Sequence, residues 1–199
     1  MAVSGEVYKE LGRAWAGAVS VVAAYGTPDD AIVALTVSSF ATLSFDPPMV
    51  MFAIQHAADS YASMVESKAF GVSLLRVEQA AVARLFASKG KEKTRATQFA
   101  HGSRTHVPLI PGSLAEIECT TCQVVLSGDH AIVIGLVEAA RTLEGRPLLY
   151  FARQYGSFSL LEEGAPKTNL AEASMPHNVG APECHIPLSS NRASQSGRK

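Results

Sequence analysis

Residues 31–50 read AIVALTVSSFATLSFDPPMV, and this stretch decides the fold. Its first part, residues 31–37, is a nearly unbroken apolar run, which predicts a buried strand. Hydroxyl side chains cluster toward and beyond the end of that strand, at Thr36, Ser38, Ser39 and Ser44. Hydroxyl and backbone N–H groups that converge at a strand end suit a phosphate. Such residues also form ordinary turns, so both interpretations stay open.

Two prolines follow this cluster, in the run Asp46-Pro47-Pro48. They remove two backbone donors and fix the direction of the chain. The next predicted strand, Met49–Ile54, therefore begins at a defined place.

The composition is that of a globular protein of one domain. The chain has 199 residues, 47% of them hydrophobic and 18% charged, and a net charge of −1. A chain of this length buries a substantial core. The balanced charge argues against nucleic acid and anionic membranes as partners. No apolar run reaches the length of a membrane span, and residues 1–15 do not resemble a signal peptide, so we expect a cytoplasmic protein.

Strands outnumber helices in the predicted element order. We expect helices at residues 6–15, 59–66 and 77–87, and strands at 19–25, 31–37, 49–54, 68–75, 115–126, 131–141 and 148–158. A turn at Gly26–Asp30 makes the first two strands an antiparallel hairpin, and Ser127–His130 joins the two long strands. The sequence therefore predicts a β-rich α+β domain.

A basic segment, Ser88–His106, differs from the rest of the chain. It contains five cations against one acid, Glu92; the cations are Lys89, Lys91, Lys93, Arg95 and Arg104. One interpretation is a solvated loop, and the other is a mobile flap that attracts the phosphates of a dinucleotide.

The cysteines predict no chemistry. Cys119 and Cys122 form a CxxC within a predicted strand, where side chains three residues apart point to opposite faces. A zinc site would need a second ligand pair, so we expect no metal. Cys184 lies in the C-terminal tail and is expected to be inert.

Three separated motifs give the chain a family resemblance. They are TVSSFATLSFDPP (residues 36–48), GDHAIVIGLVEAA (128–140) and RPLLYFARQYG (146–156). In this order they resemble the flavin reductase family, the FMN- or FAD-using reductases that partner two-component monooxygenases. The resemblance covers residues 11–161 and implies an FMN-binding split β-barrel with a few short helices.

The resemblance also implies a set of site residues. Those expected to bind the flavin are Thr36, Val37, Ser38, Ser39, Ser44, Asp46, Pro47, Ser60, Phe86 and Lys89. His130 is expected near the nicotinamide, with Asp129 fixing its tautomer. Arg153 and Tyr155 would close the site against the nicotinamide dinucleotide. From the residues alone, the alternatives are a helix cap for Ser60, a surface or locally hydrogen-bonded histidine for His130, and an edge-strand pair for Arg153 and Tyr155.

The implied function is transfer of hydride from NADH or NADPH to FMN or FAD, in a homodimer that supplies reduced flavin to an oxygenase. The chain has no GxGxxG fingerprint, which argues against a Rossmann domain. Two alternatives remain, an oxidase similar to pyridoxine 5′-phosphate oxidase and a non-catalytic FMN-binding sensor. The reductase domain is expected at residues 1–161, followed by an extended or disordered tail at 162–199 that is poor in apolar surface.

Overall fold

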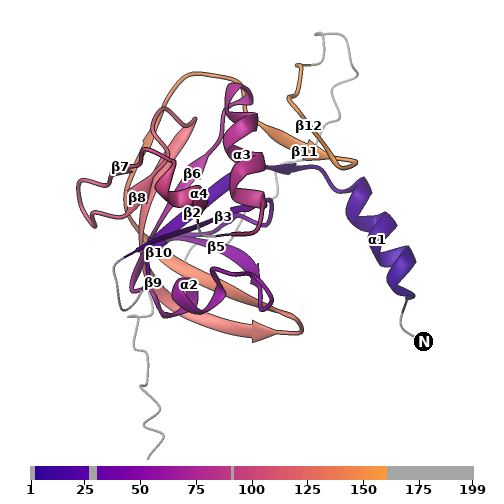
Figure 1. Cartoon of the computed structure of the whole chain (residues 1–199), viewed down its shortest axis with the longest axis horizontal. Coiled ribbons are helices and arrows are strands. Elements are labelled where there is room, and N and C mark those ends of the chain that lie inside the picture. The colour runs from indigo at the N-terminus through magenta and orange to yellow at the C-terminus, as the bar shows by residue number, and fades with distance from the viewer. Residues whose placement is uncertain (1–2, 27–30, 91, 161–199) are drawn as a thin grey trace, which may run out of the picture.

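The structure is a computed structural model that describes residues 3–26, 31–90 and 92–160. Its centre is a seven-stranded antiparallel sheet in the order β3-β2-β6-β9-β10-β5-β4 (Figure 1). The strands are β2 (Ser20–Tyr25), β3 (Ile32–Val37), β4 (Ala41–Phe45), β5 (Pro48–Gln55), β6 (Ala69–Leu74), β9 (Ala115–Ser127) and β10 (His130–Thr142). Three residues, 38–40, connect the two edge strands β3 and β4, so the sheet curls into a partly open barrel. The predicted split-barrel fold is confirmed.

Smaller elements surround the barrel. A three-stranded sheet contains β1 (Gly17–Ala18), β11 (Leu149–Phe151) and β12 (Gln154–Gly156), and β7 (Ala100–His101) pairs with β8 (Pro108–Leu109). The helices are α1 (Gly5–Ala14), α2 (Tyr61–Glu66), the 3-10 helix η1 (Val77–Gln79), α3 (Ala80–Ala87) and α4 (Glu92–Arg95). All three predicted helices are confirmed. Most of the predicted turn at 26–30, Lys91, and the predicted tail at 162–199 with Cys184 lie outside the described residues.

Three details of the prediction were wrong. Strand β3 is an edge strand, and only Ala34 and Val37 within it are buried, because its remaining side chains border an open cavity. Strand β4 was not predicted, since its alternating Thr and Ser side chains read as a turn. The predicted final strand is a hairpin that reverses at Ala152 and Arg153, both with positive φ (48° and 66°), a conformation that ordinary residues seldom adopt.

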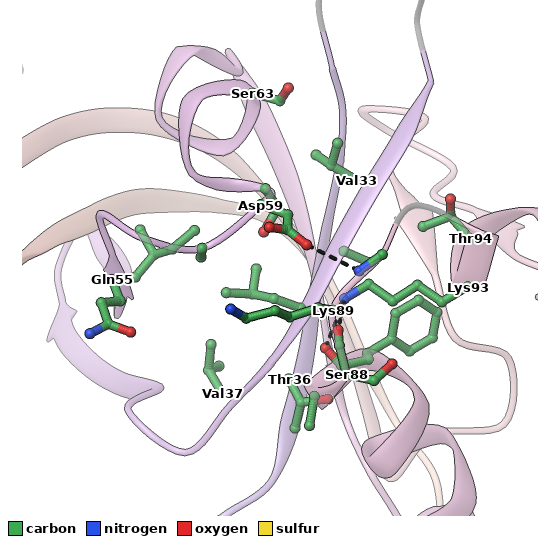
Figure 2. A pocket seen from close by; sticks show the side chains of 18 of the residues that line it. Val33, Thr36, Val37, Gln55, Asp59, Ser63, Ser88, Lys89, Lys93 and Thr94 are labelled. Atoms are coloured by element: carbon green, nitrogen blue, oxygen red, sulfur yellow. Dashed lines mark hydrogen bonds between the residues drawn. The ribbon is translucent and has the colours of Figure 1, made fainter.

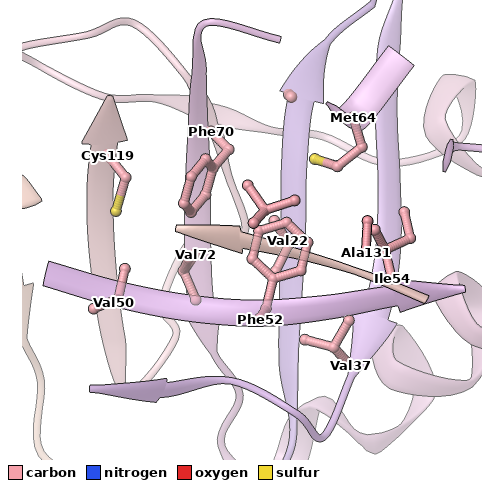
Figure 3. Packing of buried hydrophobic residues seen from close by; sticks show 12 residues of the cluster. Val22, Val37, Val50, Phe52, Ile54, Met64, Phe70, Val72, Cys119 and Ala131 are labelled. Carbon is pink, nitrogen blue, oxygen red and sulfur yellow. The ribbon is translucent and has the colours of Figure 1, made fainter. Parts of the chain in front are cut away.

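The core has two parts, one on each side of the sheet. Inside the barrel, Phe52 and Phe70 meet edge to face at 5.2 Å between ring centroids, beside Val22 and Met64 (Figure 3). On the outer side, α3 packs its buried Phe86 against strands β2 and β3. Helix α3 is thereby fixed across β3, which places its C-terminal end beside the cavity.

A buried carboxylate holds the loop that covers β6 and β9. Glu118 accepts hydrogen bonds from the backbone N–H groups of Ser103 (2.7 Å), Arg104 (2.9 Å) and Thr105 (2.6 Å). The hydroxyls of Ser103 and Thr105 donate to it as well. Burial alone would raise the pKa of Glu118, but these hydrogen bonds outweigh burial and lower it.

Helix α1 extends away from the barrel (Figure 1) and none of its residues is buried. Within the described part of the chain, no helix is both long and apolar enough to cross a membrane. Cys119 lies in the core, where burial raises the pKa of its thiol to about 12, and neither it nor Cys122 forms a disulfide.

Candidate functional site

A cavity of about 900 Å³ opens along the exposed side of strand β3 (Figure 2). It is bordered by β3, the end of β5, the start of α2 and the segment that joins α3 to α4. His130, the first residue of β10, also lines it. Residues from both halves of the chain meet here, and the volume lies in the range of cofactor and small-molecule sites.

One wall of the cavity is apolar. The half-buried Val33 and Leu35 of β3 form its accessible part, and the core residues Val37 of β3, Ile54 of β5 and Phe86 of α3 border it, with their side chains buried. Because a strand presents successive side chains to opposite faces, β3 contributes these residues at alternate positions. Such a wall suits a flat, largely apolar ring system.

Hydroxyl groups lie along the same strand end, but they are not equivalent. The Thr36 hydroxyl donates to the carbonyl oxygen of Ala83 (2.8 Å), and the Ser39 hydroxyl donates to that of Ala53 (3.1 Å). A hydroxyl has a single proton, so these two cannot donate to a phosphate while the bonds persist. Ser38 is exposed, and Ser60 precedes α2 without making a capping hydrogen bond. These two are the better phosphate donors.

Cations face the cavity from the segment after α3. Lys89, Lys93 and Arg95 line it, opposed by the carboxylate of Asp59. Figure 2 shows the ammonium of Lys89 extending across the cavity toward the side of Gln55, whereas that of Lys93 turns toward Ser88. The balance of charge favours an anionic ligand.

His130 is oriented by its neighbour, as predicted. Its Nδ1 lies 2.7 Å from Oδ1 of Asp129. The hydrogen bond with His130 lowers the pKa of Asp129, so this carboxyl is ionised at neutral pH and only accepts hydrogen bonds. The Nδ1 position therefore carries a proton, which leaves Nε2 as the ring nitrogen that faces other partners.

The cavity brings together eight of the predicted site residues: Thr36, Val37, Ser38, Ser39, Ser60, Phe86, Lys89 and His130. In the described structure, five others do not line it: Ser44, Asp46, Pro47, Arg153 and Tyr155. Ser44 belongs to β4, and Asp46 and Pro47 form the turn between β4 and β5.

Tyr155 and Arg153 lie on the β11–β12 hairpin. The Tyr155 ring packs on the outer core, with the guanidinium carbon of Arg84 5.2 Å from its centroid. Burial, then the nearby Tyr150, raises the pKa of Tyr155 against the opposing effect of Arg84. Arg153 is exposed. A role for either residue in binding the nicotinamide dinucleotide stays a prediction.

Sequence reasoning missed several residues that line the cavity. Gln55 and Ser63 gave no signal, since single polar residues at strand ends and on short helices are common. Asp59 was read only as part of a helix start. Lys93 was counted in the basic segment without a position, because its approach to the cavity depends on α4, a four-residue helix.

Comparison with known proteins identifies the family of this chain. Residues 12–159 match the family described as flavin reductase like domain. The chain belongs to the flavin reductase family. This membership confirms the predicted class of enzyme, an NAD(P)H:flavin oxidoreductase, and favours it over the oxidase and sensor alternatives.

Relatives of this chain are described as flavin reductases or as reductase components of monooxygenases. The chain is 31% identical over 158 residues to an NADH-dependent flavin reductase from a Rhodococcus species, covering 79% of this chain and 88% of that one. It is 36% identical over 151 residues to the reductase component of 4-hydroxyphenylacetate 3-monooxygenase from Thermus thermophilus, covering 75% and 94%.

Solved structures of the family share the fold. BorF, the flavin reductase component of a bacterial two-component tryptophan halogenase, superposes with a TM-score of 0.70 at 30% identity, covering 77% of this chain and 98% of that chain. The NADH:FAD oxidoreductase SgcE6 from Streptomyces globisporus, in complex with NAD and FAD fragments, superposes with a TM-score of 0.71 at 25% identity. The match covers 80% of this chain and 97% of that chain.

Proposed function

We propose that this protein reduces FMN or FAD with NADH at the cavity beside β3 and supplies the reduced flavin to a partner oxygenase. The observation that carries the proposal is the cavity itself, which combines an apolar wall, hydroxyl donors and cations in one site. Hydride transfer from nicotinamide to isoalloxazine is the chemistry that the two nucleotides supply when bound. The residues of the chain bind the two nucleotides, orient their rings and neutralise the charge of the flavin phosphate.

Each part of the cavity then has a role. The apolar wall, whose accessible part is Val33 and Leu35, shields the flavin ring from water. The hydroxyls of Ser38 and Ser60 donate to the phosphate, and Lys89 neutralises its charge. These residues fit a flavin nucleotide in size, polarity and charge.

His130 orients the second substrate. Asp129 holds its Nδ1 proton, so Nε2 accepts a hydrogen bond from the carboxamide of the nicotinamide. His130 needs to transfer no proton, because hydride moves directly between the rings.

The test is consumption of NADH and NADPH, followed by absorbance, with FMN, FAD or riboflavin added. We expect turnover with NADH and with at least one flavin nucleotide. The matched variants are Lys89→Met and Lys68→Met, which remove an exposed lysine inside and outside the cavity. Loss of FMN affinity in the first variant alone supports the site; absence of turnover with every pair of substrates overturns the function.

Delivery to an oxygenase is measured separately. Relatives described as reductase components of monooxygenases support such a partner. The expected result is that the protein with NADH and flavin sustains hydroxylation by a flavin-dependent monooxygenase that has no reductase of its own. No product above the rate with NADH and flavin alone would overturn this role.

We also propose that the protein is a homodimer that associates through the outer face of β5 and β10. Half-exposed apolar side chains gather there in register, with Ile134 opposite Met51 and Leu136 opposite Met49. Light scattering should give twice the mass of the chain. Ile134→Glu should produce a monomer, whereas Leu143→Glu, at an exposed position beyond β10, should remain dimeric.

A further inference from the structure

The segment that carries Lys89 over the cavity is fixed at both of its ends. At its start, directly after α3, the Ser88 hydroxyl donates to the carbonyl oxygen of Leu85 (2.6 Å) in the last turn of that helix. At its end, the N–H of Gly90 donates to Oδ2 of Asp59 (3.0 Å), across the cavity mouth (Figure 2). Gly90 has a φ of +103°, which other residues seldom adopt, so the path of this segment is specific.

Lys93 reaches back to the same segment from α4. Its ammonium donates to the carbonyl oxygens of Ser88 (2.6 Å) and Phe86 (3.2 Å). Burial lowers the pKa of Lys93, and the nearby charge of Asp59 opposes this shift. The donors of Lys93 are therefore directed at the protein backbone, while the Lys89 side chain is exposed to the cavity.

Asp59 is otherwise difficult to explain in an anion site. A carboxylate that lines the cavity repels a phosphate by Coulomb interaction. Its hydrogen bond to Gly90 and its proximity to Lys93 give it a different use, because together they anchor the Ser88–Gly90 segment to the start of α2.

We propose that Asp59 and Lys93 are positioning residues that hold the Ser88–Gly90 segment so that Lys89 meets the phosphate of the flavin nucleotide. This inference rests on the proposed function. Beside the hydroxyls of Ser38 and Ser60, three residues then discriminate between a phosphorylated flavin and riboflavin, and of these three only Lys89 contacts the ligand.

Asp59→Ala gives the sharpest test, because the two explanations predict opposite signs. If Asp59 acts only through its charge, removing it strengthens FMN binding. If Asp59 positions Lys89, FMN binding weakens by about 10-fold or more, the value of a lost charge-assisted hydrogen bond. The affinity for riboflavin, which lacks the phosphate, should change less than about 2-fold, since no such bond is lost. Both affinities are measured by quenching of flavin fluorescence.

Lys93→Met should give the same phosphate-specific loss, with a raised KM for FMN and an unchanged kcat at saturating flavin. Lys68→Met is the matched control and should leave both affinities unchanged. Equal weakening of FMN and riboflavin would show a general structural defect and overturn the inference. So would FMN binding by Asp59→Ala that is unchanged or tighter.

A double variant separates positioning from direct contact. If Lys93 acts through Lys89, the Lys89→Met and Lys93→Met double variant loses no more FMN affinity than Lys89→Met alone. If the double variant instead loses FMN affinity by the product of the two single-variant losses, Lys93 contacts the phosphate itself, which overturns its positioning role. A wild-type protein that binds neither flavin would overturn the proposed function instead, so the two failures are distinguishable.

Discussion

The Ser39 hydroxyl donates to the carbonyl oxygen of Ala53 (3.1 Å) and accepts from the N–H of the same residue (3.0 Å). Strand β4 pairs with β5 from Ala41, opposite Met51, onward. Two residues before Ala41, the side chain of Ser39 therefore takes the place of a backbone partner and extends the ladder of β5. Because Ser39 and Ala53 both line the cavity, this contact fixes the connection between β3 and β4 against β5 at the wall of the site.

Replacing this hydroxyl should weaken both the fold and the site. Ser39→Ala removes the side-chain partner of two backbone groups of Ala53 at an exposed position, at a cost of about 0.5–1.5 kcal/mol in the free energy of unfolding. Urea denaturation measures the loss. Thr42→Ala, at an exposed position of β4, should stay within about 0.5 kcal/mol. An equal loss in the two variants would contradict the role of Ser39.

His130 should affect the nicotinamide substrate and not the flavin. His130→Asn removes one hydrogen-bond acceptor, so kcat/KM for NADH should fall by about 3–10-fold while flavin affinity stays constant. The control is His56→Asn, since the His56 ring packs on Tyr61 (4.9 Å between centroids) and does not line the cavity. Loss of flavin affinity in His130→Asn would place His130 on the flavin instead.

Glu118 should make the stability of the fold depend on pH. Because its pKa is lowered in the folded protein, its contribution is complete above the unfolded pKa of about 4.3 and is lost as pH falls through the folded value. Glu118→Gln should cost roughly 1.5–3 kcal/mol at pH 7. The difference from wild type should stay constant between about pH 6 and 8 and narrow below about pH 4.3. Glu144→Gln, at an exposed position, should show neither effect.

Gly71 marks a close approach between β6 and the β7–β8 segment. A methyl group on Gly71 would overlap the carbonyl oxygen of Pro108, which is backbone and cannot rotate away. Gly71→Ala should therefore cost about 1–3 kcal/mol in thermal or urea unfolding. Gly156→Ala meets no atom within 4 Å and should be neutral. An unchanged free energy of unfolding in Gly71→Ala would mean that the β7–β8 segment shifts freely.

The long strands could be predicted because their signal is strong. In β10, Ala131, Val133 and Gly135 are buried, whereas Ile132 and Ile134 are half-exposed, as alternation predicts. Short elements gave little signal. The β11–β12 hairpin turns at Ala152 and Arg153, which carry no glycine or asparagine to indicate a positive φ.

The site could be predicted as a set of residues and not as an arrangement. The sequence predicts the cluster of hydroxyls and Lys89. It does not predict which hydroxyl can donate to a ligand, because that depends on hydrogen-bond partners distant in sequence. Thr36 bonds to Ala83, 47 positions away, and Ser39 to Ala53. The predicted domain boundary at 161 and the 162–199 tail stay predictions.

The burial of Cys119 bears on how long such an enzyme survives its own product. Reduced flavin that escapes transfer reacts with dioxygen and forms hydrogen peroxide, which oxidises thiolates. With a pKa of about 12 and no solvent exposure, the Cys119 sulfur remains a protonated thiol beyond the reach of peroxide. The Cys119 thiol therefore resists the hydrogen peroxide that forms when reduced flavin reacts with dioxygen near the protein.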